Sequence, residues 1–426
     1  MNLHSPLVRS FLTVGAIRIL AIPLGLVTSI VLARYLGPEA FGRYAFVMAL
    51  LPLLSLPVAG GLVQLLTREA AGYLYEGQWS SLRGLSRAAC AWVILVSLVL
   101  SAAYLMADAV VGFPSEGKWA LLGLLVPLIP LSGLTSVTKG LVKGLGRPSL
   151  AEFPSQIIKP LSVLVGLGGL LLWHELTPSS AILVQVGSGA LVLAVSTLIL
   201  ARVMPPQAHQ QSATYFPMFW VGSLLPFTMM IAAGTLNAHI GIVLLGFLGA
   251  DEGVAALRVG ERAAQFVVMS LVLVNMVIAP HLVRAYRAGD LAKLQRLFRQ
   301  SARGAFLIAS VVSLVLLLFG RPLIALSFGE AYASIAYSPM LVLVAGQLIN
   351  VFFGSVGTIL NMSGFERYTL MGQMCALMVN VLTCLYLIPQ YGALGAATGA
   401  SVGLVTWNLL LGIMMIRHLK IRPTVL

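Results

Sequence analysis

The sequence predicts an all-α polytopic membrane protein with about twelve transmembrane helices. Three observations support this fold class: a composition poor in charge, a succession of apolar runs of membrane-spanning length, and short motifs that recur in the second half. Together they predict two pseudo-symmetric six-helix bundles around a central cleft.

Composition alone indicates a membrane protein. Of the 426 residues, 59% are hydrophobic and 9% are charged, and the mean hydropathy is +0.97. A soluble fold needs about 25% charged residues to keep its surface hydrated. Most of this surface must therefore face hydrocarbon. The three cysteines lie in apolar runs without CxxC spacing, so we expect neither a disulfide framework nor a metal site.

Apolar runs divide the chain into spans. A membrane-spanning helix needs about 20 mostly apolar residues, and no linker between the runs is long enough for a separate soluble domain. The first run is too long for the apolar region of a cleavable signal peptide and is interpreted as a retained span. We expect spans near residues 10–33, 41–66, 88–108, 118–139, 153–173, 179–201, 217–247, 254–282, 304–326, 336–361, 368–388 and 391–416.

The net charge of +13 is explained by membrane topology. Nucleic-acid-binding proteins gather Lys and Arg on one soluble patch, whereas here these residues lie in short segments between apolar runs. If the N-terminus is cytoplasmic, most of the 26 basic residues fall in inner segments, as the positive-inside rule requires. We therefore expect both termini in the cytoplasm and no nucleic-acid partner.

Short motifs recur at an offset of about 210–220 residues, which indicates duplication. Six spans per half is an even number, so both halves share one orientation and the repeat axis runs along the membrane normal. We therefore expect a six-helix half at 1–208 and another at 209–426, with a cleft suited to alternating access between them. The matching sets are Leu36-Gly37 with Leu248-Gly249; Leu82, Leu85 and Arg87 with Leu294, Leu297 and Arg299; and Gly144, Arg147 and Leu150 with Gly364, Arg367 and Leu370.

Each half also contains a short basic amphipathic stretch after its second span. These stretches are interpreted as short helices lying on the anionic inner leaflet of the membrane. Their apolar faces comprise Trp79, Leu82 and Leu85 in the first half, and Leu291, Leu294, Leu297 and Phe298 in the second.

Three segments resemble one known family. They are LARYLGPEAFGRYAF from Leu32 to Phe46, the stretch from Phe328 to Tyr368, and IPQYGALGAATGASVG from Ile388 to Gly403. They resemble Wzx-type flippases of polysaccharide (O-antigen-like) repeat units, in the multidrug/oligosaccharidyl-lipid/polysaccharide exporter superfamily. The likeness covers nearly the whole chain in length, span count and loop placement, and the block from Pro389 to Gly403 is its most specific part.

The resemblance implies a MATE-like fold, with two six-helix bundles meeting at a V-shaped cleft. It also implies translocation of an isoprenoid-pyrophosphate-linked oligosaccharide across the bacterial inner membrane, for a surface polysaccharide such as the O-antigen of lipopolysaccharide. Expected partners are this substrate, membrane lipids, and the polysaccharide polymerase and chain-length machinery. We expect no cofactor and no catalytic residues. The family offers no short motif to carry over, so candidate sites are argued from the residues.

Ionisable groups within spans are costly and are therefore candidate functional residues. Arg18 lies about eight residues into the first span, roughly 12 Å along a helix, and Lys159 adjoins Pro160 in the fifth span. The i, i+3, i+4 spacing of Arg258, Glu261 and Arg262 places them on one helix face, where Glu261 can pair with one arginine. We expect the four cations to line the cleft and hold the pyrophosphate. The alternative is snorkelling combined with pairing between helices.

Several uncharged polar residues also lie at depth. Gln64, Asn237, Gln265 and His239 could contact substrate in the cleft or form hydrogen bonds between helices. His239 could also carry a proton in coupling, because its reference pKa is near physiological pH. By contrast, the glycines at Gly395, Gly399 and Gly403 are interpreted as a ridge for tight helix packing.

Two other functions were weighed. A cation-coupled multidrug exporter of the related branch would need acidic groups in the cleft, yet among the thirteen acids Glu261 alone was placed clearly within a span. A membrane-embedded glycan polymerase or ligase would need a large outer loop, and the outer segments are short. Walker, HExxH and nucleophile-elbow motifs are absent from the sequence, so an enzyme is not expected. The sequence leaves open the glycan, the coupling ion and the oligomeric state.

Overall fold

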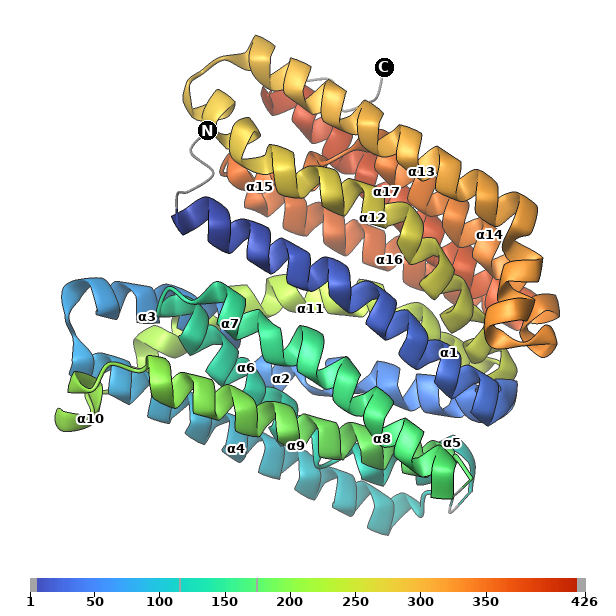
Figure 1. Cartoon of the computed structure of the whole chain (residues 1–426), viewed down its shortest axis with the longest axis horizontal. Coiled ribbons are helices and arrows are strands. Elements are labelled where there is room, and N and C mark those ends of the chain that lie inside the picture. The colour runs from blue at the N-terminus through green and yellow to red at the C-terminus, as the bar shows by residue number, and fades with distance from the viewer. Residues whose placement is uncertain (1–5, 115, 174, 420–426) are drawn as a thin grey trace. The chain divides into compact units, whose positions relative to one another are not determined.

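The computed structural model describes residues 6–114, 116–173 and 175–419 (Figure 1). Within these ranges the chain is almost wholly helical and contains no strand. The predicted all-α polytopic membrane fold is therefore confirmed.

Among the described residues, nine helical stretches are long and apolar enough to cross a membrane. A tenth is the pair Gly117–Leu125 and Leu128–Gly144, bent by 42°. The first stretch, Thr13–Glu76, has 64 residues and contains two of the predicted spans. They are separated at Gly37, whose φ of 76° and ψ of 170° break the helix. Because a straight 64-residue helix would be about three times as long as a bilayer core is thick, this stretch must turn back.

The chain divides into two compact units. The N-terminal unit comprises Met1–Leu36 and Val47–Ala232, and the C-terminal unit comprises Gly37–Phe46 and Ala233–Leu426. One helix, α11 (Pro217–Leu248), contributes residues to both. The predicted halves at 1–208 and 209–426 stay a prediction, and each compact unit is described by itself.

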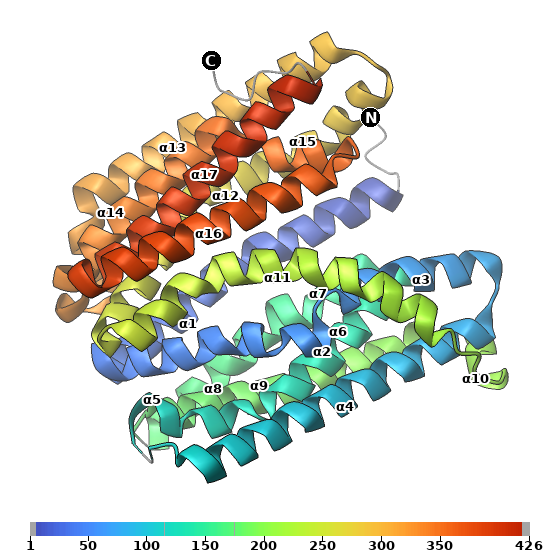
Figure 2. The same cartoon turned by 180° about the vertical axis from the view of Figure 1, so that it is seen from behind.

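In the N-terminal unit, α6 (Leu128–Gly144) packs among neighbouring helices (Figure 2). A Cβ atom on Gly140 would lie 2.8 Å from Leu66 Cβ, and one on Gly144 would lie 2.7 Å from Ala70 Cβ. Small residues therefore let α6 approach α3 closely. The other elements are α1 (Pro6–Leu54) apart from its Gly37–Phe46 segment, α2 (Leu56–Ala59), α3 (Leu62–Glu76), α4 (Trp79–Val111), α5 (Gly117–Ala120), a 3₁₀ turn (Leu122–Leu125), α7 (Pro148–Phe153), a π-helical turn (Pro154–Ile158), α8 (Lys159–Trp173), α9 (Pro178–Val203), α10 (Gln207–Gln210) and the first part of α11.

In the C-terminal unit, α16 (Glu366–Tyr391) and α17 (Ala393–Leu419) form a tight hairpin. A Cβ atom on Gly399 would lie 2.4 Å from Cys384 Sγ, and one on Gly395 would lie 2.4 Å from the Leu387 carbonyl oxygen. The glycine ridge is thus a packing surface, as predicted. The other helices are the second part of α11, α12 (Asp251–Arg287), α13 (Leu291–Phe328), α14 (Glu330–Phe353) and α15 (Val356–Met362).

The Gly37–Phe46 segment packs within the C-terminal unit, although it comes early in the chain. A Cβ atom on Gly42 would lie 1.8 Å from the Asp251 carbonyl oxygen, so any larger residue would force the two backbones apart. Arg43 Nε lies 3.3 Å from Asp251 Oδ2, and Phe46 is fully buried. Most of the first stretch that resembles the flippases is thus a part of α1 that packs within the C-terminal unit.

The interpretation of the amphipathic stretches as separate membrane-surface helices is wrong. They are the first turns of α4 and α13, which continue for 33 and 38 residues. Leu82 and Leu85 are buried in one unit, and Leu294 and Phe298 in the other. An apolar face at helical spacing suits a protein interior as well as a lipid surface, so the pattern alone could not distinguish the two.

Candidate functional site

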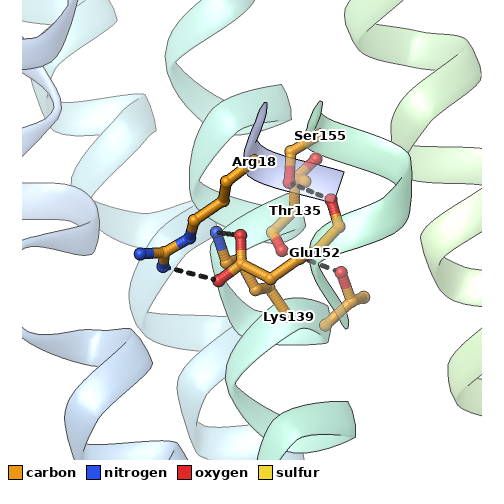
Figure 3. Close-up of polar contacts among 6 residues, drawn as sticks. Arg18, Thr135, Lys139, Glu152 and Ser155 are labelled. Atoms are coloured by element: carbon orange, nitrogen blue, oxygen red, sulfur yellow. Dashed lines mark hydrogen bonds and ion pairs between the residues drawn. The ribbon is translucent and has the colours of Figure 1, made fainter. Parts of the chain in front are cut away.

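A buried carboxylate joins two cations in the N-terminal unit (Figure 3). The Glu152 side chain is 3% exposed; its Oε2 lies 2.8 Å from Lys139 Nζ, and its Oε1 lies 3.4 Å from Arg18 Nη2. The three residues come from α7, α6 and α1. We call Arg18, Lys139 and Glu152 the Glu152 cluster.

Local backbone features bring Glu152 back towards α6. Gly146, with a φ of +81°, turns the chain after α6, and Pro148 starts α7 at a position where proline is favoured. After Glu152 the helix continues through Pro154 into a π-helical turn. Such turns are rare and occur frequently at functional sites.

The Glu152 cluster holds two cations for one carboxylate. A carboxylate this deeply buried requires charged or hydrogen-bonding partners, and both cations supply them. The Arg18 side chain is still 54% exposed, and the Lys139 side chain is 24% exposed. A guanidinium carries five N–H donors, and the Arg18–Glu152 contact joins one nitrogen to one oxygen. Arg18 can therefore keep its contact with Glu152 and still bind an external anion.

The sequence predicted only part of this cluster. Arg18 was a candidate, but Lys139 was assigned to an inner segment and Glu152 was placed just before the fifth span. The apolar stretch in fact covers Pro148–Leu172, so Glu152 lies within a candidate span, whereas α12, which carries Glu261, is not among the candidate spans of the described residues. The π-helical turn carries the helix through Pro154, so the helical stretch begins before the expected span at 153–173.

Two other candidates lie outside the cluster. Lys159 begins α8, is half-buried, and forms no ion pair or hydrogen bond through Nζ within the described part of the chain. Gln64 on α3 is also half-buried, and its amide bonds to no described residue. The structure does not bring either side chain into contact with Glu152.

A polar pocket of ≈ 440 Å³ lies within the C-terminal unit. Its wall includes five residues predicted from the sequence, namely Asn237, Arg258, Glu261, Arg262 and Gln265. It also includes Gln347, Gln373 and Trp407, which the sequence analysis missed. These three stand singly in apolar helices and produce no periodic signal. We call this space the polar pocket.

Charge in the polar pocket is partly neutralised. Arg258 Nη1 lies 3.0 Å from Glu261 Oε2, the pairing expected from their spacing, and the two side chains are 29% and 27% exposed. Arg262 Nη1 donates a hydrogen bond to Gln265 Oε1 at 3.3 Å. The face of α12 that borders the polar pocket therefore carries two arginines and one carboxylate.

Some of the predicted polar residues link helices. Asn380 Nδ2 donates to Asn237 Oδ1 at 3.0 Å, so Asn237 joins α11 to α16 and also borders the polar pocket. His239 Nδ1 is buried and has no hydrogen-bond partner among the residues that the structure describes. His239 has no ion pair with a carboxylate in the described ranges, and its suggested part in coupling stays a prediction.

Comparison with known proteins identifies the family. A model of polysaccharide biosynthesis proteins matches residues 7–286, which include the Glu152 cluster and both Arg258 and Arg262. The chain belongs to this family. No curated protein matches the sequence closely enough to be counted as a relative.

Solved structures similar to this family member are transporters. An inward-facing multidrug resistance MATE family transporter of the MOP superfamily has a TM-score of 0.76 at 15% identity, over 95% of this chain and 99% of that one. The lipid II flippase MurJ, inward closed, has a TM-score of 0.73 at 13% identity, over 94% and 87%. A MOP superfamily transporter from Pyrococcus furiosus has a TM-score of 0.64 at 14% identity, over 96% of both chains.

These matches confirm the predicted MATE-like fold and the predicted resemblance to polysaccharide flippases of this superfamily. The protein is a multi-pass membrane protein of the polysaccharide biosynthesis family, and it shares its fold with these transporters.

Proposed function

We propose that this protein flips isoprenoid-pyrophosphate-linked oligosaccharide units across the bacterial inner membrane, for synthesis of a cell-surface polysaccharide such as O-antigen. The observation that carries the proposal is the Glu152 cluster, in which two cations meet one carboxylate and one of the two, Arg18, is half-exposed. A pyrophosphate is the anionic part of such a substrate. Guanidinium groups bind phosphate oxygens in a bidentate manner, and lysine contributes a point charge.

The charge balance favours this function over cation-coupled multidrug export. A cationic drug would need an unengaged carboxylate, but Glu152 is buried between two cations and Glu261 is paired with Arg258. MurJ, which shares the fold, is named as a flippase of lipid II. The Pyrococcus furiosus transporter is described as having a binding pocket of reverse polarity, which suggests a different function for it.

The topology and partners belong to the same proposal. Both termini lie in the cytoplasm, because most Lys and Arg residues then fall in inner segments. The flipped unit would next be used by a polysaccharide polymerase and its chain-length machinery. No cofactor or catalytic residue is part of this proposal.

Deletion of the gene in its own host tests the function. Lipid-linked oligosaccharide should accumulate on the inner leaflet, surface polysaccharide should disappear, and the wild-type chain should restore it. Arg18→Ala should fail to restore it at equal protein level, because the exposed phosphate-binding donors are lost. Lys159→Ala, which neutralises a cation outside the Glu152 cluster, is the matched comparison and should have the smaller effect. Full restoration by Arg18→Ala, or restored resistance to cationic drugs without restored polysaccharide, would refute the proposal.

A further inference from the structure

We propose that the polar pocket binds the neutral sugar part of the substrate through the amides of Gln265, Gln347 and Gln373 and the ring of Trp407. This rests on the proposed function, which assigns the pyrophosphate to cationic groups but leaves the glycan without a site. The four residues come from α12, α14, α16 and α17, so the pocket collects uncharged polar groups from four helices.

The glutamine amides retain unused hydrogen-bonding groups. Gln265 Oε1 accepts from Arg262, and Gln347 Oε1 accepts from Asn350 Nδ2 at 3.2 Å, but neither Nε2 donates to a described residue. Gln373 is half-buried and forms no side-chain hydrogen bond within the described ranges. Each amide NH₂ can donate twice, and leaving such groups unsatisfied within a membrane protein is costly. Water or the hydroxyl groups of a ligand must therefore satisfy them.

Asparagines, and not these glutamines, hold the neighbouring helices together. Asn408 Nδ2 donates to Asn350 Oδ1 at 3.0 Å, and Asn380 Nδ2 donates to Asn237 Oδ1 at 3.0 Å. Asn380 and Asn408 are 1% and 2% exposed, as helix-to-helix links should be. The hydrogen bonds between these helices are thus made by asparagines, so the glutamines of the polar pocket are not needed to hold the helices together.

Trp407 supplies the flat surface that a sugar ring requires. A Cβ atom on Gly357 would lie 3.3 Å from its Cζ2, and one on Gly372 would lie 3.6 Å from its Cε3, so two glycines make room for the indole. Its Nε1 forms no hydrogen bond in the part of the chain that the structure describes, and it is not buried. A tryptophan with an apolar face and an available N–H donor suits a ligand that is apolar on one face and hydroxylated at its edge.

Size and the amide groups of the wall agree with a neutral glycan. The pocket of ≈ 440 Å³ lies within the usual range of roughly 300–1,000 Å³ for small-molecule sites. The Arg258–Glu261 pair removes one charge of each sign from the wall. Amides that both donate and accept match hydroxyl groups, which do the same.

The test uses the lipid that the proposed function predicts. Extract from host cells lacking the gene supplies polyprenyl-pyrophosphate-linked glycan, and polyprenyl pyrophosphate without sugar is the second probe. Both are titrated onto the purified full-length protein in detergent. Gln373→Leu and Trp407→Ala should each weaken binding of the glycan-linked lipid by about tenfold, the effect of one lost hydrogen bond or stacking contact. Binding of the sugar-free lipid should not change.

Two variants control for structural effects. Gln390→Leu makes the same substitution on an exposed position of α16 and should change neither affinity. Trp407→Phe keeps an aromatic face and should recover part of the loss. If Trp407→Ala does not fold, as judged by its thermal unfolding midpoint, Gln373→Leu with Trp407→Phe decides the question.

The outcomes separate the two levels of the proposal. If deleted cells accumulate no lipid-linked glycan, or wild-type protein binds neither probe, the proposed function fails and the sugar site fails with it. If wild type binds both probes but the pocket variants weaken both equally or neither, the sugar site alone is refuted.

Discussion

The Glu152 cluster and the polar pocket place polar groups in apolar helices in two different ways. In the Glu152 cluster, a carboxylate that is 3% exposed is held between two cations, so the polar groups of this region are charged. In the polar pocket, an ion pair that is 27–29% exposed lies beside amides and an indole, so many of the hydrogen-bonding groups there are uncharged. The difference suggests that one region is built for an anion and the other for hydroxyl groups.

Glu152→Ala should cause the largest loss of stability, and it tests most directly whether the buried carboxylate distinguishes the Glu152 cluster from the polar pocket. It leaves Lys139 without its buried counter-ion, and removing one partner of a buried pair costs about 3–5 kcal/mol. The thermal unfolding midpoint of the purified protein in detergent should fall steeply. An unfolding midpoint equal to that of the wild type would show that the carboxylate is not a structural centre.

Lys139→Met and Arg18→Ala should separate stability from transport within the Glu152 cluster. Lys139 makes the shorter contact at 2.8 Å and is less exposed, so its loss should cost about 2–3 kcal/mol of stability. The Arg18 side chain is 54% exposed and lies 3.4 Å from Glu152 Oε1, so Arg18→Ala should lower the free energy of unfolding by less than about 1 kcal/mol. Surface polysaccharide should nevertheless disappear with Arg18→Ala. Equal losses of stability in the two variants would contradict this division.

Asn408→Leu sharpens the distinction between amides that pack helices and amides that face the polar pocket. It removes hydrogen bonds to Asn350 Oδ1 and to the Leu404 carbonyl oxygen, so stability should fall by about 1–2 kcal/mol. The ratio of affinities for glycan-linked and sugar-free lipid should stay at the wild-type value. A changed ratio would mean that Asn408 contributes to ligand selection.

Glu261→Gln should have the smallest effect on stability, below about 1 kcal/mol, because its pair with Arg258 is partly exposed and screened. Denaturant or thermal unfolding of both Glu261→Gln and Glu152→Gln measures the two losses of stability side by side. If both substitutions cost the same, the two acids have equivalent environments and the contrast between the regions fails.

The sequence predicted the fold class well because hydrocarbon imposes composition and span length directly. It also predicted that Glu261 pairs with an arginine on its own helix face, and the partner in the structure is Arg258 at i, i+3 spacing. It missed the Lys139–Glu152 contact, which depends on a turn at Gly146 and on a helix continuing through Pro154. Gln347, Gln373 and Trp407 were missed because isolated polar residues show no period, and only tertiary packing brings them to one pocket.

The Gly37–Phe46 segment bears on how this chain could be divided. A fragment starting at residue 209 would lack Phe46, whose ring fills the space left by Gly246, and it would lack the arginine that pairs with Asp251. Such a fragment should be unstable alone. Co-expression with residues 1–208 should restore its stability, because that fragment supplies the Gly37–Phe46 segment that packs within the C-terminal unit. We therefore expect the two fragments to complement each other. Gly42→Leu in the first fragment should abolish this complementation, because the larger side chain would collide with the Asp251 backbone.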